Sequence, residues 1–218
     1  MKNIDYILIL LIIFISCSNL GEKKTLTDFF SEDYKNFRFH NKIGIINLDS
    51  VSNFSELRKK MSELTCEGKS SGLRFVKNDT IFYLTGLADC PTSSEIGCYF
   101  SRNLLFVRND SLLIEYGKNK KKKPIRFLKA KLDEIMSQNH NYQHNKNKLK
   151  PALIHFYVED KYPIETTTRA LKEIIRQFKK INSQNGSDYF KYNILFEKYD
   201  ITNIPLGSPP KPNEFDNE

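Results

Sequence analysis

The clearest structural signal in this chain lies in residues 152–196, which read ALIHFYVEDKYPIETTTRALKEIIRQFKKINSQNGSDYFKYNILF. Residues 152–158 form an apolar run without charge, which is typical of a strand at the centre of a sheet. Pro163 then opens a segment whose apolar residues recur every three or four positions, as a buried helix face requires. A second apolar run, residues 190–196, predicts a further strand. The stretch as a whole predicts a strand–helix–strand unit.

The residues before this unit extend the same alternation. Leu112 to Tyr116 predicts a strand, and Pro124 begins an amphipathic segment at a position where its missing N–H costs a helix nothing. An Asn-rich loop follows, from Asn139 to Asn147. The C-terminal half of the chain, residues 103–200, therefore predicts a β-α-β-α-β arrangement.

Two similar hairpins are predicted from an internal repeat. Asn78-Asp79 and Asn109-Asp110 occupy matching places in residues 72–81 and 103–112, each between β-rich runs. Asn and Asp tolerate the positive φ angles of tight hairpin turns. With a strand from Ile43 and a short helix opened by Asn53, the pattern predicts an α+β fold. We expect a mixed sheet with two β-hairpins and with helices mainly on one face.

The N-terminus resembles a bacterial lipoprotein signal. One cationic residue, Lys2, precedes an apolar run from Tyr6 to Ile15 that ends at Ser16-Cys17. About ten apolar residues match the core of a signal peptide, whereas a spanning helix needs about twenty. The resemblance implies cleavage before Cys17 and lipidation of its thiol. An uncleaved membrane anchor is the alternative.

These observations predict the following segments: residues 1–16 as signal segment or membrane anchor, 17–40 as a tether, 41–200 as one α+β envelope domain (41–102 and 103–200 being its two parts), and 201–218 as a disordered, Pro-rich tail.

Three cysteines remain if Cys17 is lipidated. An exported chain enters an oxidising compartment, in which a disulfide persists. We expect Cys90 and Cys98 to be bonded because they flank a short turn-rich loop, leaving Cys66 free. Cys66 as one of the two partners is the alternative.

The positive charge is local. The formal net charge is +8, and residues 118–150 alone carry eleven basic and two acidic residues. Five lysines in this region predict contact with anionic surfaces such as lipid headgroups: Lys118, Lys120, Lys121, Lys122 and Lys123. A plain solvated loop is the alternative. Aromatic residues do not alternate with these cations, so we expect no nucleic-acid partner.

No catalytic signature stands out. The chain has no Gly-rich phosphate loop, nucleophile elbow or zinc-protease helix motif. His140 and His144 are four residues apart but lie among asparagines that disfavour a helix, which favours a solvated loop over a metal site. His155 lies in an apolar run and is expected to be a hydrogen-bonded core residue. We therefore expect a protein without enzymatic activity, cofactor or metal.

The C-terminal half also resembles the periplasmic domain of the ExbD/TolR family, the small subunits of proton-driven envelope motors. The likeness lies in residues 154–161, an apolar strand that runs into Asp160-Lys161, and in a helix opening near Ile164-Glu165-Thr166. The family's single transmembrane helix carries one proton-handling Asp before an apolar run, and Ile4-Asp5 stands at that place here. The resemblance implies that Asp5 carries protons.

Together these features predict a membrane-anchored protein of the cell envelope that faces the periplasm. The expected function is a non-catalytic binding or scaffolding role, with membrane lipid and other envelope proteins as partners. The alternative is an ExbD/TolR-like subunit of an envelope transport complex driven by the proton-motive force.

Overall fold

The structure, a computed structural model, describes residues 26–38, 42–92, 103–115, 121–144 and 147–203. Its elements are β1 (Thr27–Phe30), α2 (Glu32–Phe37), β2 (Ile43–Asn47), η1 (Leu48–Ser50), α3 (Phe54–Cys66), β3 (Ser70–Lys77), β4 (Thr80–Gly86), β5 (Asn103–Arg108), β6 (Ser111–Glu115), β7 (Lys121–Pro124), η2 (Ile125–Phe127), α4 (Leu128–Ser137), η3 (Asn139–Asn141), β8 (Ala152–Tyr157), α5 (Ile164–Asn185), β9 (Tyr192–Phe196) and η4 (Ile201–Asn203). The α+β class is confirmed.

The strands divide between two mixed sheets, where the sequence predicted one. The first sheet has the order β1-β4-β3-β2 and the second the order β7-β6-β5-β8-β9. They meet at one bridge, in which Leu87 and Leu195 pair in parallel. Gly86 makes this approach possible, since a Cβ there would lie 2.7 Å from Met61 Cε and from Phe196 Cε2.

Both predicted hairpins are confirmed. β3 and β4 pair antiparallel around Asn78 and Asp79, whose φ angles are +48° and +57°. β5 and β6 pair antiparallel around Asn109, whose φ is +58°. These left-handed angles are the conformation that Asn and Asp accept at low cost, so the repeated dipeptide sets both turns.

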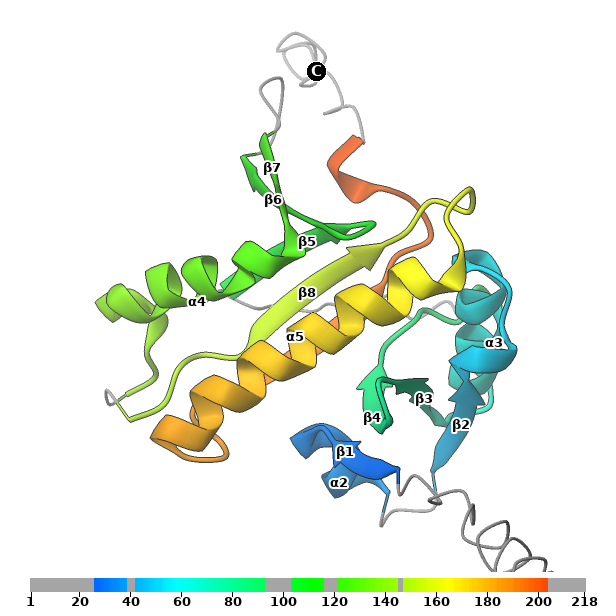
Figure 1. Ribbon diagram of the computed structural model, residues 1–218, viewed down its shortest axis with the longest axis horizontal. Helices are drawn as coiled ribbons and strands as arrows, with labels where there is room; N and C mark the ends of the chain where they lie inside the picture. The colour runs from blue at the N-terminus through cyan, green and yellow to red at the C-terminus, as the bar shows by residue number, and fades with distance from the viewer. Residues whose placement is uncertain (1–25, 39–41, 93–102, 116–120, 145–146, 204–218) are drawn as a thin grey trace, which may run out of the picture.

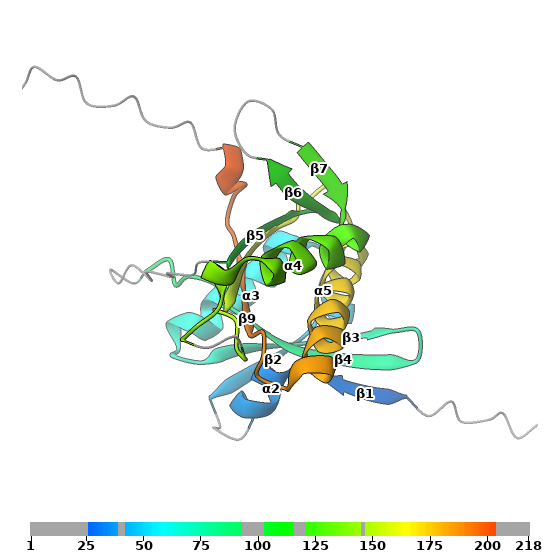
Figure 2. The same ribbon diagram turned by 90° about the vertical axis from the view of Figure 1, so that its left-hand side faces the viewer.

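Helix α5 fills the space between the two sheets (Figures 1 and 2). β5, β8 and β9 are parallel neighbours, and the chain moves across the sheet in the same direction at both crossovers, from β5 to β8 and from β8 to β9. Because such connections are right-handed, α4 and α5 lie on the same face of the second sheet. Leu171, Ile174 and Phe178 on α5 are fully buried. The predicted apolar face of this helix is the centre of the core.

Helix α3 packs against strands of both sheets. It begins as predicted, with the Asn53 side chain accepting from Glu56 N at 2.9 Å and Glu56 accepting from Ser52 N at 2.9 Å. The ring of Phe54 lies 5.8 Å from those of Phe156 and Phe196. This aromatic cluster packs the start of α3 against β8 and β9.

Part of the predicted tether belongs to the folded domain. Residues 27–30 form β1, which pairs in parallel with β4, and residues 32–37 form α2. Tyr34 of α2 is buried and stacks near Phe30 and Tyr83. Phe29, Phe30 and Tyr34 are therefore used for packing. Among the residues described, no helix has the length and hydrophobicity needed to cross a membrane.

The predicted disulfide is corrected. The structure joins Cys66, the last residue of α3, to Cys90, which follows β4. Because the sulfur atom of Cys90 is bonded to Cys66, it is not available to Cys98. Cys98 itself lies outside the described residues. The pairing depends on the return of β4 alongside β3, which carries Cys90 back to the end of α3.

We expect the disulfide between Cys66 and Cys90 to stabilise the protein by about 3 kcal/mol, because it closes a loop of 24 residues in the unfolded chain. Peptide mapping of unreduced protein should recover a fragment that joins these cysteines, and Cys66→Ser should lower the urea midpoint. A fragment joining Cys90 to Cys98 would contradict the assignment.

Candidate functional site

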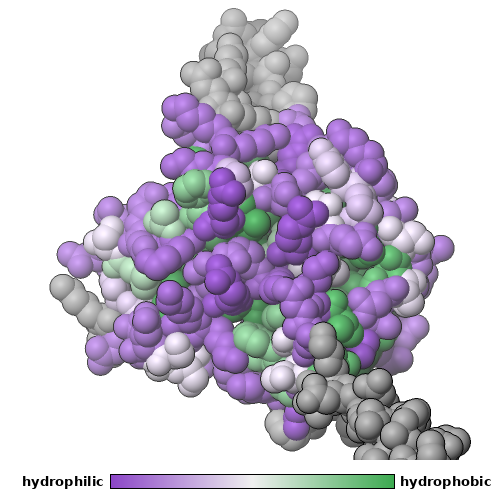
Figure 3. Space-filling model, viewed as in Figure 1, coloured by the Kyte–Doolittle hydropathy of each residue, from purple (hydrophilic) through white to green (hydrophobic). Residues whose placement is uncertain are grey.

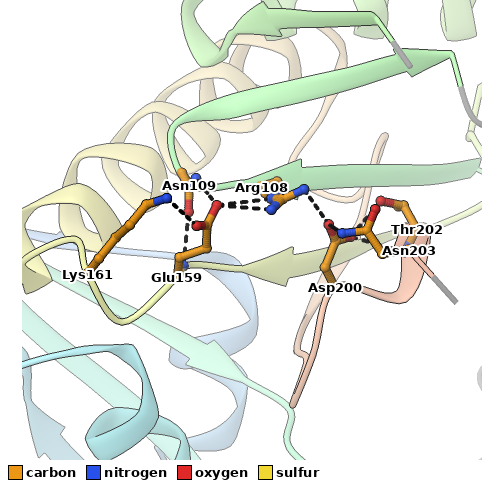
Figure 4. A network of polar contacts seen from close by, with 7 residues as sticks. All are labelled: Arg108, Asn109, Glu159, Lys161, Asp200, Thr202 and Asn203. Carbon is orange, nitrogen blue, oxygen red and sulfur yellow. Dashed lines mark hydrogen bonds and ion pairs between the residues drawn. The ribbon is translucent and has the colours of Figure 1, made fainter. Parts of the chain in front are cut away.

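One candidate site lies beyond the carboxyl ends of the parallel strands β5, β8 and β9, where α/β sheets commonly bind ligands. Arg108 ends β5 and pairs in register with Tyr157, so Glu159 follows close to it beyond β8. Asp200 follows β9. We call this cluster the Arg108 network, shown in Figure 4: Arg108, Asn109, Glu159, Lys161, Asp200, Thr202 and Asn203.

Arg108 lies between two carboxylates. Its Nη2 is 3.0 Å from Glu159 Oε1, and its Nη1 is 2.6 Å from Asp200 Oδ2 (Figure 4). Asn109 Nδ2 donates to Glu159 Oε1 at 3.1 Å, and Asn109 Oδ1 accepts from Glu159 N at 2.9 Å. Two carboxylates already neutralise the charge of the Arg108 guanidinium, so it has little attraction for an incoming anion.

Glu159 is held in its charged form. Lys161 Nζ lies 2.6 Å from Glu159 Oε2, and this hydrogen bond, with those from Asn109 and Arg108, lowers the pKa of Glu159 to about 2. A carboxylate with so low a pKa is a poor proton donor at neutral pH. The Arg108 network therefore fastens the segment at Asp200 to the second sheet, and we interpret it as structural.

The hydrogen bond predicted for His155 is confirmed, but the residue is half-buried and does not belong to the core as predicted. Its Nδ1 lies 2.6 Å from Glu197 Oε1, and its ring stacks on Phe106 at 4.8 Å between centroids. The side chain is 17% exposed. This pair lies beside the Arg108 network and shares a small hollow with it, lined among others by Tyr157 and Thr202. Among the described residues, no three His, Cys, Asp or Glu side chains are placed to hold a metal.

The second candidate site is an apolar groove of about 330 Å³ between β1 and α5, which we call the β1–α5 groove. Residues 29–33 line one wall, and residues 175–192 supply the other, including Phe178 and Phe190. Figure 3 shows hydrophobic surface between hydrophilic side chains in the lower part of the molecule, where Figure 1 places β1. The size and lining are those of a ligand pocket.

Charged groups stand at the rim of the β1–α5 groove. Lys179 Nζ lies 3.8 Å from the centre of the Phe29 ring, a cation–π contact. Asp33 is half-buried, and burial raises the pKa of its carboxyl, an effect that nearby Lys191 opposes. Burial likewise raises the pKa of the Tyr192 hydroxyl, whose ring packs on Phe178 at 4.2 Å. The groove therefore combines an apolar floor with charges of both signs.

Several predicted site residues lie outside the described residues: Asp5, Cys17, Cys98, Lys118 and Lys120. Their predicted roles stay predictions. Lys121, Lys122 and Lys123 lie on β7, an exposed edge strand, where the sequence predicted a loop. Lys121 pairs with Glu115 at 2.9 Å. Lysines on an edge strand also prevent pairing with other chains, so edge protection is a second explanation for this cluster.

Sequence reasoning did not find the β1–α5 groove. Phe29 and Phe30 were noticed as aromatic residues of the tether, which was the available signal. No pattern in the sequence marks Lys179 or Asp33 as a site residue. Their position beside the groove depends on how β1 pairs with β4 and on how far α5 extends.

The fold and the groove together define a two-sheet α+β protein with a helix between the sheets and an apolar groove beside that helix. Comparison of the chain with protein-family models, curated proteins and solved structures finds no match. Its function must therefore be argued from the residues themselves.

We expect Glu159→Gln to lower the free energy of unfolding at pH 7 by about 1 kcal/mol, through the loss of charge-assisted hydrogen bonds. The pKa of Glu159 is about 2 in the folded protein and ordinary in the unfolded chain. Its contribution is therefore fully present above about pH 4.5 and disappears as the pH falls toward 2. Urea midpoints of both proteins should converge over this interval.

Glu63→Gln, at an exposed position on α3, is the matched control and should leave the midpoint nearly unchanged at each pH. A constant difference between wild type and Glu159→Gln from pH 7 to pH 2.5 would contradict the assigned role.

Proposed function

We propose that the protein is a lipid-anchored component of the cell envelope, facing the periplasm, that binds a partner without catalysis in the β1–α5 groove. The observation that carries the proposal is the groove itself, about 330 Å³ in volume, in whose wall five aromatic side chains and Ile175 stand among polar and charged ones. Such a lining favours the burial of apolar groups of a ligand, which is the main favourable term in association.

The N-terminal sequence supports the anchor. The apolar run ends at Ser16-Cys17, and residues 18–26 separate Cys17 from β1. Nine residues span at most about 30 Å when fully extended. A lipid on Cys17 would therefore keep the groove, whose wall begins with Phe29, close to the membrane surface.

The lysines of β7 fit a different role in this arrangement. β1 and β7 lie at opposite ends of the molecule in Figure 1. In an orientation with β1 nearest the membrane, the strand that carries Lys121, Lys122 and Lys123 lies on the side of the molecule far from the lipid. Protection of a sheet edge then accounts for them better than contact with anionic headgroups.

We expect cells that express the protein to incorporate a palmitate analogue at Cys17. Cys17→Ala should abolish the label, because thioether formation needs the thiol, and Cys98→Ala should keep it. Mass spectrometry of the mature N-terminus is the direct measurement. A purified chain that keeps Met1 and carries no label would reject the anchor.

The groove is tested separately with 8-anilinonaphthalene-1-sulfonate, a fluorescent apolar probe. Ser183 lines the groove, so Ser183→Trp should fill part of it and weaken probe binding by about fivefold or more, roughly 1 kcal/mol. Gln184→Trp, on the exposed adjoining position of α5, should bind as wild type does. Equal probe binding by both variants would contradict the assignment of the groove.

A further inference from the structure

Strand β1 has a free edge. Thr27 N donates to Asp79 O at 3.0 Å, and Ser31 N donates to Tyr83 O at 2.8 Å. Because main-chain groups alternate in direction along a strand, those of Asp28 and Phe30 point away from β4. β1 ends the strand order of its sheet, so no other described strand pairs with these groups. They form a short row of main-chain donors and acceptors that are not paired with any described residue.

The β1–α5 groove lies on this free side. Its lining residues come from residues 29–33 and from residues 175–192, and none comes from β4. A strand added beside β1 would run along the groove. Since successive side chains of a strand point to opposite faces, every second side chain of the added strand would face the aromatic wall around Phe29 and Phe178. The free edge and the groove are therefore two parts of one surface.

Glu32 on this surface is paired with Lys35 at 2.7 Å, and Lys191, which acts on the Asp33 carboxyl, is itself paired with Asp188 at 3.3 Å. Two further carboxylates form no ion pair with a described residue. Asp28 is exposed, Asp33 is half-buried, and neither forms an ion pair or side-chain hydrogen bond. A partly desolvated carboxylate without a partner gains when a cation reaches it. The charge complementary to these two carboxylates is a lysine or arginine of the partner, near the apolar side chain that fills the groove.

We propose that β1 accepts an extended segment of another protein as an additional strand, with an apolar side chain in the β1–α5 groove and with basic side chains at neighbouring positions that face Asp28 and Asp33. This inference rests on the binding function proposed above and specifies the class of partner that binds, an extended peptide segment. An acyl chain would fill the groove but would leave the main-chain groups of Asp28 and Phe30 unpaired. A second copy of this chain would bring the same acids together across the contact.

The variant that tests strand addition is Asp28→Pro. Proline removes the outward N–H and places a ring on the free edge, while the ladder to β4 loses no hydrogen bond. Thr27, the preceding residue, is already extended, as proline requires. The matched control is Ile45→Pro on β2, the opposite edge of the same sheet, where Ser70 N bonds to Lys42 O so that residue 45 also points outward.

The probe is a random seven-residue peptide library displayed on phage, selected against the detergent-solubilised full chain. We expect selected peptides to combine an apolar residue with a neighbouring Lys or Arg. The affinity of the synthetic peptides should fall about tenfold or more for Asp28→Pro and about threefold for Asp33→Asn, with no change for Ile45→Pro.

A scan of N-methylated peptides against the unaltered protein makes the test independent of how the variants fold. Methylation at alternate residues should abolish binding, since only every second amide faces β1. Uniform tolerance of methylation, equal affinity for Asp28→Pro, or the absence of selected peptides would each overturn the proposal. If the fluorescent probe still binds the groove while no peptide does, the partner class is wrong and the groove keeps its function. If neither binds, both proposals fail.

Discussion

The burial of α5 between two sheets is the constraint on which the rest of the structure depends. Eleven of its residues are buried, including Thr166 and Ala170 outside the narrow apolar stripe. A helix covered on so much of its circumference needs protein on several sides. The second sheet supplies one side through β8 and β9, and the first sheet with α3 supplies another. Each sheet has a hydrophobic face that only α5 and its neighbours bury.

The same helix produces the candidate site. α5 runs 22 residues, from Ile164 to Asn185, and its C-terminal part, with Phe178 and Lys179, faces β1. β1 is a short parallel strand and α2 a helix of one and a half turns. These small elements leave space beside the longer helix instead of closing over it. The groove is present because α5 is longer than the two elements that cover its C-terminal part, β1 and α2.

Local patterns in the sequence predicted local structure. The period of the apolar residues identified α5 and α4, the uncharged run identified β8, and the Asn-Asp pairs identified both hairpins. Relations between distant segments were beyond reach. The junction of the two sheets depends on the pairing of Leu87 with Leu195, and the disulfide depends on the return of β4 to the end of α3. The groove could not be predicted for the same reason, because Phe29, Asp33 and Lys179 become neighbours only in the folded chain.

The position of the disulfide sets an order on folding. Cys66 and Cys90 both belong to the first sheet and its helix, so this bond can form before any residue of the second sheet has been synthesised. The hydrophobic face of that first sheet nonetheless stays bare until α5 emerges, near the end of the chain. A chain whose disulfide forms at that stage is covalently closed but only half-covered, the kind of species that aggregates when it persists. A chaperone that shields this face would act during a defined window, which closes when Asn185 leaves the ribosome or the translocation channel.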